Sequence, residues 1–385
     1  VDGLRRRIGE MRHPIPALDA APDPALDRFC EELIRAADTV ELVAGLYGVA
    51  VPRLIGAYRE HLDRANILVD QPTRRVLRFA LVELVDAVEW GGAALAGLLG
   101  TDREAAVRAD AWKRHLDAYL AAAGGVSGAE PLPSEPLPPP RATEPFVPDL
   151  TPRRDARFHG QHQFDFPPHV IYNDPAAPAD ERNLALLAKR TLEMDVPEMM
   201  ASVMIERTDL PWEFHRDYSR QLWDECRHAM MGTVAFEARG YDWTKIPLNV
   251  GFSLRLNRHA TALERQTILF AIEQSLMPGE TGKRFEMRTA AAAGDALSTH
   301  FHDYDWADEV LHARIGRRWL KHDGISAEEA SRRAAEIHER TWAALDQYRT
   351  PPPPGDWWDD LVRQLLGRPS AIPPERRADL DILAE

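Results

Sequence analysis

Cysteine is scarce in this sequence, because Cys30 and Cys226 are the only two among its 385 residues. Two cysteines cannot form the disulfide framework of a small secreted protein, so we expect a reducing environment. No apolar run approaches the length of a membrane span, and the opening VDGLRRRIGE lacks the apolar core of a signal peptide. The sequence therefore predicts a cytoplasmic protein without a membrane partner.

Positively charged residues are also fewer than negatively charged ones. The sequence has 47 Lys and Arg and 61 Asp and Glu, which gives a formal net charge of −14. This balance disfavours nucleic acid and anionic membranes as partners, and with them a tRNA-modifying activity. A phosphate-binding glycine loop and a nucleotide motif are also absent from the sequence. With 44% hydrophobic and 28% charged residues, the composition is typical of a globular protein.

Proline, in contrast, is abundant and unevenly placed. The stretch 124–152, GGVSGAEPLPSEPLPPPRATEPFVPDLTP, cannot form a helix or a central strand, and it predicts a semi-rigid extended linker. It separates a first domain at 1–123 from a second at 153–348. A second proline run begins a tail at 349–385, in which we expect one short helix.

Both domains show the apolar spacing of helices, and strand patterns are almost absent. The fold class is therefore predicted as all-α. Four segments of the first domain predict an up-down helical bundle, with Glu41 on its surface. The second domain has four long helical segments, at 181–208, 211–240, 264–293 and 295–324.

One constellation occurs twice in the second domain. DECRHA in the segment 211–240 and DEVLHA in the segment 295–324 each place a Glu three residues before a His. Because positions i and i+3 share a helix face, Glu225 with His228, and Glu309 with His312, can each present two ligands to one point. One such pair also fits a solvated helix face, but two copies favour a metal site. Carboxylate-bridged di-metal bundles use this pair on two helices and one Glu from each of the other two.

The segment 181–208 offers two carboxylates for the third helix. Counted from the predicted turn, Glu193 lies level with Glu225, whereas Glu198 lies about 6 Å out of level at 1.5 Å per residue. Pro197 lies inside this predicted helix and could shift the heights by a turn. We therefore favour Glu193 and keep Glu198 as the alternative.

The segment 264–293 poses the same choice for the fourth helix. Glu280 lies level with Glu309, and Glu273 lies one heptad further from the turn. Pro278 could displace either residue. We favour Glu280 as the ligand and keep Glu273 as an alternative or additional one.

These motifs resemble the ferritin-like superfamily over about residues 180–322. DECRHA and DEVLHARIGRRWL look most like bacterial ferritin-like proteins with two Asp-Glu-x-x-His motifs. They are also similar to O₂-activating di-iron enzymes: ribonucleotide reductase small subunits, soluble acyl desaturases, bacterial multicomponent monooxygenases and arylamine N-oxygenases. The resemblance implies a ferritin-like antiparallel four-helix bundle, to which the first domain is an addition. The sequence departs from the family's pattern at EMDVPE, because a proline is not expected at this point of the helix.

The resemblance also implies a ligand set for two iron ions: Glu193, Glu225, His228, Glu280, Glu309 and His312. Asp224 and Asp308 would accept hydrogen bonds from the metal-bound histidines and so hold the orientation of their rings. Carboxylate and imidazole donors suit Fe²⁺, with Mn²⁺ as the other choice, rather than an ion that prefers thiolates.

Three further residues share the faces of the two motifs and are candidates for a catalytic role. Tyr218 lies on the face of Glu225, as a core tyrosine or as a redox or substrate-pocket residue. His302 and Asp305 lie on the face of Glu309, where His302 could be an extra ligand. By contrast, His159, His162 and His169 follow no ligand spacing, and we expect them in loops.

We therefore expect a non-haem di-iron oxidase or oxygenase that uses O₂ to oxidise a small organic substrate. An electron donor and a second copy of the chain, as a homodimer, are the other expected partners. The alternative is a ferritin-like protein with a structural, partner-binding or iron-handling role. A bundle kept only for packing gains nothing from burying several carboxylates, which favours the first interpretation.

Overall fold

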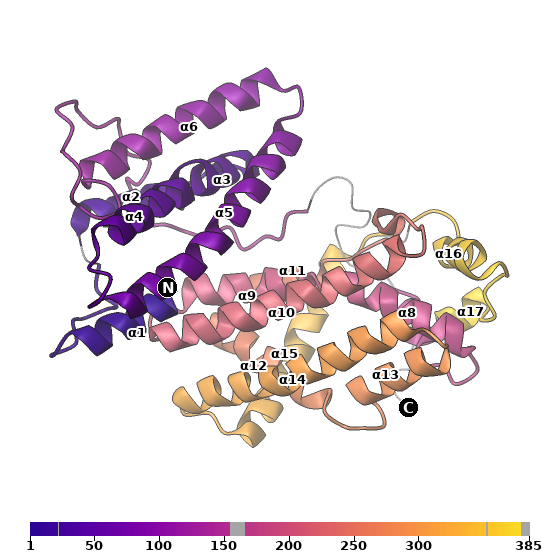
Figure 1. Cartoon of the computed structure of the whole chain (residues 1–385). Helices are drawn as coiled ribbons and strands as arrows, with labels where there is room; N and C mark the ends of the chain where they lie inside the picture. Colours follow the sequence, from indigo (N-terminus) through magenta and orange to yellow (C-terminus); the bar gives the residue numbers. More distant parts are fainter. Residues whose placement is uncertain (22, 155–165, 352, 379–385) are drawn as a thin grey trace. The chain divides into compact units, whose positions relative to one another are not determined.

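A computed structural model describes the chain except for residues 22, 155–165, 352 and 379–385. The described residues form helices and no β-strand, so the all-α prediction is confirmed. The chain divides into two compact units, Val1–Val147 and Pro148–Glu385 (Figure 1). The histidines at 159 and 162 lie outside the described residues. His169 belongs to a short helix rather than to a loop.

The described part of the first unit is built from seven helical elements: α1 (Asp2–Met11), α2 (Pro24–Leu33), α3 (Thr39–Gly45), η1 (Leu46–Ala50), α4 (Val51–Arg64), α5 (Gln71–Leu99) and α6 (Arg103–Ala122). Asp102 caps α6 by accepting hydrogen bonds from the backbone N–H groups of Glu104 and Ala105. The core gathers around Trp112 and Leu116 of α6.

The proline-rich segment packs on this first unit as far as Val147. The Glu32 carboxylate accepts hydrogen bonds from the backbone N–H groups of Arg141 at 2.9 Å and Ala142 at 2.8 Å. The Arg141 guanidinium donates to Glu41 at 2.6 Å, and Glu41 is buried. The prediction of a surface position for Glu41 was therefore wrong, because a sequence pattern cannot reveal a partner 100 residues away.

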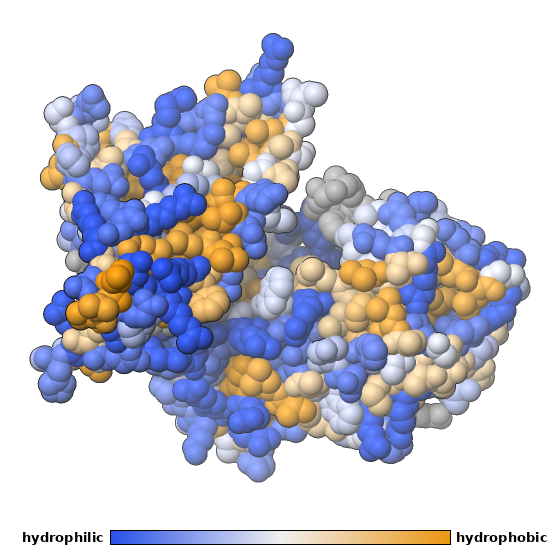
Figure 2. Space-filling model, in the orientation of Figure 1, coloured by the Kyte–Doolittle hydropathy of each residue, from blue (hydrophilic) through white to orange (hydrophobic). Residues whose placement is uncertain are grey.

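One continuous helical stretch of the first unit, Thr39–Arg64, is long and apolar enough to cross a membrane, because an 18-residue window within it has a mean hydropathy of 1.4. Length and composition alone identify it, and 28% of the apolar window is buried within the protein. The expectation that no run approaches this length was wrong for this stretch. The neighbouring α5 exposes Phe79, Val82 and Trp90, and Figure 2 shows hydrophobic residues on the surface of this unit.

The described part of the second unit is also helical. Its elements are α7 (Pro168–Ile171), α8 (Ala179–Leu192), α9 (Asp195–Glu206), α10 (Trp212–Glu237), η2 (Trp243–Lys245), α11 (Gly251–His259), α12 (Ala262–Ser275), α13 (Lys283–Ala292), α14 (Ala296–His322), α15 (Ala327–Ala343), η3 (Leu345–Tyr348), α16 (Trp357–Leu366) and α17 (Pro374–Arg377). The expected C-terminal tail belongs to this unit, since Trp358 Nε1 donates to the buried Glu181 at 3.1 Å.

The two helices that carry the repeated motif, α10 and α14, pack against each other (Figure 1). Each also packs closely on a second helix at a glycine four residues after its motif histidine. A Cβ on Gly232 of α10 would meet the backbone of α8 at Thr191, at 2.7 Å. A Cβ on Gly316 of α14 would meet Phe270 of α12 at 2.9 Å. Both glycines thus let the partner helix approach the motif.

Two of the four long helical segments are broken. The segment 181–208 forms α8 and α9, with Glu193 as the C-cap of α8. The segment 264–293 forms α12 and α13, separated by the residues around Pro278 and Gly282. Proline cannot donate the helical hydrogen bond, and a Cβ on Gly282 would lie 2.0 Å from the Leu276 carbonyl oxygen. The chain therefore makes a tight break where the sequence pattern predicts a continuous helix.

Candidate metal centre

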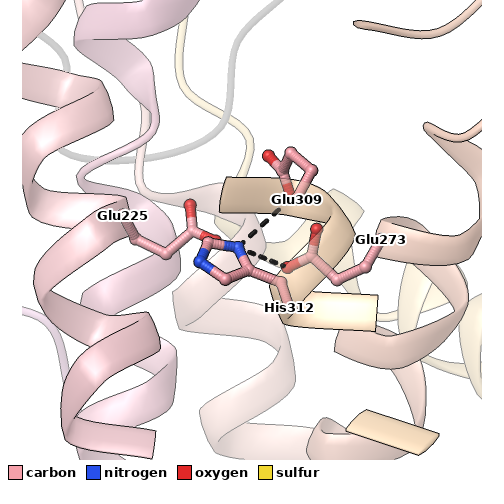
Figure 3. A group of neighbouring side chains, drawn as sticks. All are labelled: Glu225, Glu273, Glu309 and His312. Atoms are coloured by element: carbon pink, nitrogen blue, oxygen red, sulfur yellow. Dashed lines mark hydrogen bonds and ion pairs between the residues drawn. The ribbon is translucent and has the colours of Figure 1, made fainter. Parts of the chain in front are cut away.

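Four buried side chains from α10, α12 and α14 converge in the core of the second unit: Glu225, Glu273, Glu309 and His312. We call them the first group (Figure 3). Each contributes one ligand atom, and these atoms all lie within 4.8 Å of one another. His312 Nδ1 lies 3.1 Å from Glu225, 3.2 Å from Glu309 and 3.8 Å from Glu273. This group could hold a metal ion.

The first group carries more negative charge than its surroundings neutralise. It combines three carboxylates with one imidazole, and each of these side chains is at most 4% exposed. Burial, together with the Glu309 and Glu225 carboxylates, raises the pKa of Glu273 well above its ordinary value. Against the effect of burial, Asp224, followed by the Glu225 and Glu309 carboxylates, holds the pKa of His312 well above its ordinary value. A divalent cation would relieve this repulsion.

A second group lies beside the first and comprises Glu193, His228 and Asp305. His228 Nδ1 lies 3.2 Å from Asp305 Oδ1 and 3.5 Å from Glu225 Oε2. Within the described residues this nitrogen makes no hydrogen bond, although His228 is fully buried. An unpaired buried imidazole nitrogen that faces carboxylates suits a metal ligand.

Two cations of the chain already occupy the surroundings of the second group. Lys283 Nζ lies 2.9 Å from Asp305, 2.9 Å from Glu309 and 3.8 Å from Glu193. Arg190 lies 2.7 Å from Asp305 and 2.8 Å from Glu193. Against the effect of burial, Arg190 and Lys283 lower the pKa of Asp305. The second group therefore has metal donors, but its charge is balanced by the protein itself.

The two motif helices support each other's histidines. Asp308 of α14 lies 3.2 Å from Nε2 of His228 on α10, and Asp224 of α10 lies 3.4 Å from Nε2 of His312 on α14. Both Nδ1 atoms are thereby directed at the carboxylates. Arg227 forms ion pairs with both aspartates. These contacts are the ones expected of residues that hold metal-bound histidines in place.

The structure brings some of the expected carboxylates to the centre and leaves others outside it. Glu193, Glu225 and Glu309 reach the two groups, and Glu273 does so in place of Glu280. The side chain of Glu280 is 84% exposed and pairs with Arg288, so the preference for it was wrong. The break after α12 removes Glu280 from the helix and leaves Glu273, in the last turn of α12, facing the core.

The alternative carboxylate Glu198 has a different role. It forms a 2.8 Å ion pair with Arg154 and belongs to neither group. Because Glu193 ends α8 and Glu198 lies in the first turn of α9, the two residues are not on one continuous helix. Of the two candidates, the structure brings only Glu193 to the centre.

The three candidate catalytic residues occupy separate places. Tyr218 is buried in an apolar cluster with Phe214, and burial raises its pKa further above the ordinary value. Asp305 lies within the second group. His302 forms a third group with Asp305 and Glu286, and His302 Nδ1 lies 3.5 Å from Glu286.

Several participants were missed by the sequence patterns. Lys283 and Arg190 are the buried cations of the centre, and Glu286 accepts from Arg190 at 2.9 Å. Gln221 is not one of those missed, because helical spacing places it on the face of Glu225, and its Nε2 donates to Glu273 at 2.9 Å. Arg190 lies three residues before Glu193, which places both on one face of α8, so helical spacing could have identified it. The contacts of Lys283 depend on the break between α12 and α13.

Comparisons of the chain with protein-family profiles, with curated proteins and with solved structures find no match. The functional interpretation therefore depends on the residues of the centre and on the contacts between them.

Proposed function

We propose that this protein is a non-haem di-iron oxidase or oxygenase that uses O₂ to oxidise a small organic substrate. The observation that carries the proposal is the first group, in which three buried carboxylates and one imidazole share a point without an equal positive charge. Burying such charges without a cation is costly, and a metal ion is the usual compensation.

The donor types support iron, with manganese as the second choice. Carboxylate oxygens and imidazole nitrogens suit Fe²⁺ and Mn²⁺, whereas zinc and copper sites often include thiolates. Cys226 adjoins Glu225 in sequence but belongs to none of the groups among the described residues. Two ferrous ions, when bound, supply the electrons with which O₂ is reduced.

The chain's own residues would bind, orient and shield these ions. The first group would hold one ion, and Glu193, His228 and Asp305 would hold the other. Filling the second position requires the Lys283 ammonium to move from the Asp305 carboxylate. Lys283 Nζ would then hold a proton near Glu309. The proposal also includes the ferritin-like bundle, which the packing of α10 and α14 on α8 and α12 supports.

Metal analysis of the full chain tests the proposal. The protein is reconstituted anaerobically with ferrous iron, desalted and analysed for metal, and O₂ consumption is then followed. We expect two irons per chain, the first bound more tightly, and O₂ consumption that requires both. Absence of bound iron and manganese after reconstitution would refute the proposal, as would zinc at a single position.

The charge balance of the second group favours a second candidate function. Because Lys283 and Arg190 neutralise Asp305 and Glu193 without a metal, the centre could hold one ion in a structural or iron-handling role. One iron per chain, with slow oxidation that no small molecule accelerates, is the result expected of this alternative.

A further inference from the structure

A cavity of about 540 Å³ lies in the second unit and reaches the second group. Most of its wall is apolar and includes Phe166, Leu192, Val196, Ile272 and Leu345. The wall also includes Glu193, a member of the second group. A cavity of this size accommodates a small organic molecule, and here such a molecule would lie beside a candidate metal ligand.

Arg255 of α11 contributes an unusual cation to this cavity. The residue is 4% exposed, and its guanidinium donates one hydrogen bond, of 2.6 Å, to Thr341. The guanidinium lies 5.7 Å from the ring centroid of Phe252 and 5.2 Å from that of Trp342. Among the described residues it has no carboxylate within ion-pair distance. Burial lowers its pKa to about 10, although Asp195 acts in the opposite direction, so it is charged at neutral pH.

The other cations of the cavity wall differ from Arg255, because each has a carboxylate partner. Lys189 lies 2.5 Å from Glu286, and Arg377 lies 2.5 Å from Asp356. Arg349 lies 3.4 Å from Asp346. Burial lowers the pKa of His169 to about 4, which leaves that imidazole neutral at pH 7. The cavity therefore has one buried positive charge with which no carboxylate of the described residues is in ion-pair contact, since Asp195, also in the wall, pairs with Arg154 at 3.6 Å.

We propose that this cavity binds an apolar monocarboxylic acid, whose carboxylate pairs with Arg255 and whose apolar body extends toward Glu193. A planar guanidinium matches a carboxylate through two parallel hydrogen bonds. One unmatched positive charge fits a monoanion, whereas a phosphate monoester would bring a second negative charge without a partner. The apolar wall matches a hydrocarbon chain or ring. The acid as substrate rests on the proposed function, but its binding does not require a metal.

Titration calorimetry with decanoate and its neutral analogue decan-1-ol tests this proposal on the full chain. We expect decanoate to bind the unaltered protein at least ~10-fold more tightly than decan-1-ol, because hydrogen bonds between two charged groups are stronger than those to a neutral hydroxyl. Arg255→Met should remove this preference. Arg258→Met, which removes an exposed arginine from the same helix, should retain it. Equal binding of acid and alcohol by the unaltered protein overturns the proposal, as does tight decanoate binding by Arg255→Met.

Thermal unfolding separates ligand binding from a structural role of Arg255. A buried charge without a counterion lowers stability, so Arg255→Met should unfold at the same temperature as the unaltered protein or higher. A large destabilisation would show a structural role and overturn the proposal. Arg255→Lys keeps the charge but loses the planar fork, and it should bind decanoate more weakly than the unaltered protein.

The same titration on metal-free and metal-loaded protein distinguishes this inference from the proposed function. Selective decanoate binding supports the anion site whether or not iron is bound, whereas failure of the same protein to take up iron on reconstitution refutes only the di-iron proposal. Bound iron without selectivity for decanoate supports iron binding by the centre and refutes the anion site at Arg255.

Discussion

The two halves of the centre contain the same kinds of residues, yet they differ in what neutralises them. The first group has three carboxylates and one histidine, and the nearest cation, Lys283, contacts its edge at Glu309. The second group has two carboxylates and one histidine, with Lys283 and Arg190 directly on Asp305. The two Asp-Glu-x-x-His motifs are nearly the same in sequence, but the charged residues around the two groups differ. A site's demand for a metal therefore depends on the cations brought to it as well as on its ligands.

Among the variants that test this difference, removal of the buried Lys283 ammonium should have the largest effect, which is on stability. Lys283→Met leaves the buried Glu309 without its ammonium partner and Asp305 with Arg190 alone, and breaking a buried pair typically costs about 3–5 kcal/mol. We expect the metal-free variant to lose stability on this scale in urea denaturation, and bound Fe²⁺ to restore part of it. The exposed Lys321→Met on α14 is the control. Unchanged stability of metal-free Lys283→Met would mean that the two halves do not differ in charge balance.

Loss of a carboxylate from the first group should abolish tight metal binding. Glu273→Gln removes a negatively charged ligand, and we expect affinity for Fe²⁺ or Mn²⁺ to fall more than about 100-fold, beyond the ~10–100-fold effect of losing a residue that supports a ligand. Glu280→Gln is the matched control, because Glu280 is exposed and on the same segment. Competition with a chelator measures the affinity. Equal losses in both variants would contradict the position assigned to Glu273.

Substitution of the aspartates that contact the histidines should have a smaller effect on metal affinity, and each substitution should affect one of the two metal positions. Asp224→Asn weakens the support of His312 in the first group, and Asp308→Asn weakens that of His228 in the second. Each should reduce affinity by about 10–100-fold at its own position. Stepwise titration with Fe²⁺ would resolve the tighter and the weaker event. A loss at the tighter event from Asp308→Asn would reverse the assignment of the two halves.

The smallest effect is expected from a change at Glu32 of the first unit. This buried carboxylate is stabilised by hydrogen bonds from the protein itself, without a metal. Despite burial, the N–H groups of Ala142 and Arg141, together with His115, lower its pKa. A lowered folded-state pKa contributes stability above the unfolded pKa, near 4.3, and this stability is lost as pH falls through the folded value. Glu32→Gln should therefore lose about 1–3 kcal/mol at pH 7 and converge with the unaltered protein in acid.

Denaturation of the unaltered protein, Glu32→Gln and the exposed Glu83→Gln over a range of pH checks this prediction. The difference for Glu83→Gln should be close to zero throughout. A difference for Glu32→Gln that grows toward acid would have the wrong sign and would exclude the proposed contribution of the carboxylate.

Helix class and motif faces were predictable because both depend on local spacing. Residues three apart on a helix lie on one face in any packing, so Glu225 with His228 and Glu309 with His312 needed no knowledge of the fold. The choice between Glu273 and Glu280 was different. It required the end of α12, and the sequence pattern indicated only that Pro278 could displace the residues around it.

By itself, the sequence determined that the protein is helical and that two Asp-Glu-x-x-His faces exist, because hydrogen bonds and side-chain spacing within one helix act over a few residues. Tertiary structure alone decided that Lys283 neutralises Asp305 and that Arg255 lies in an apolar cavity. Those outcomes depend on burial and on charges from distant segments. Such interactions are strong only after packing has removed the surrounding water.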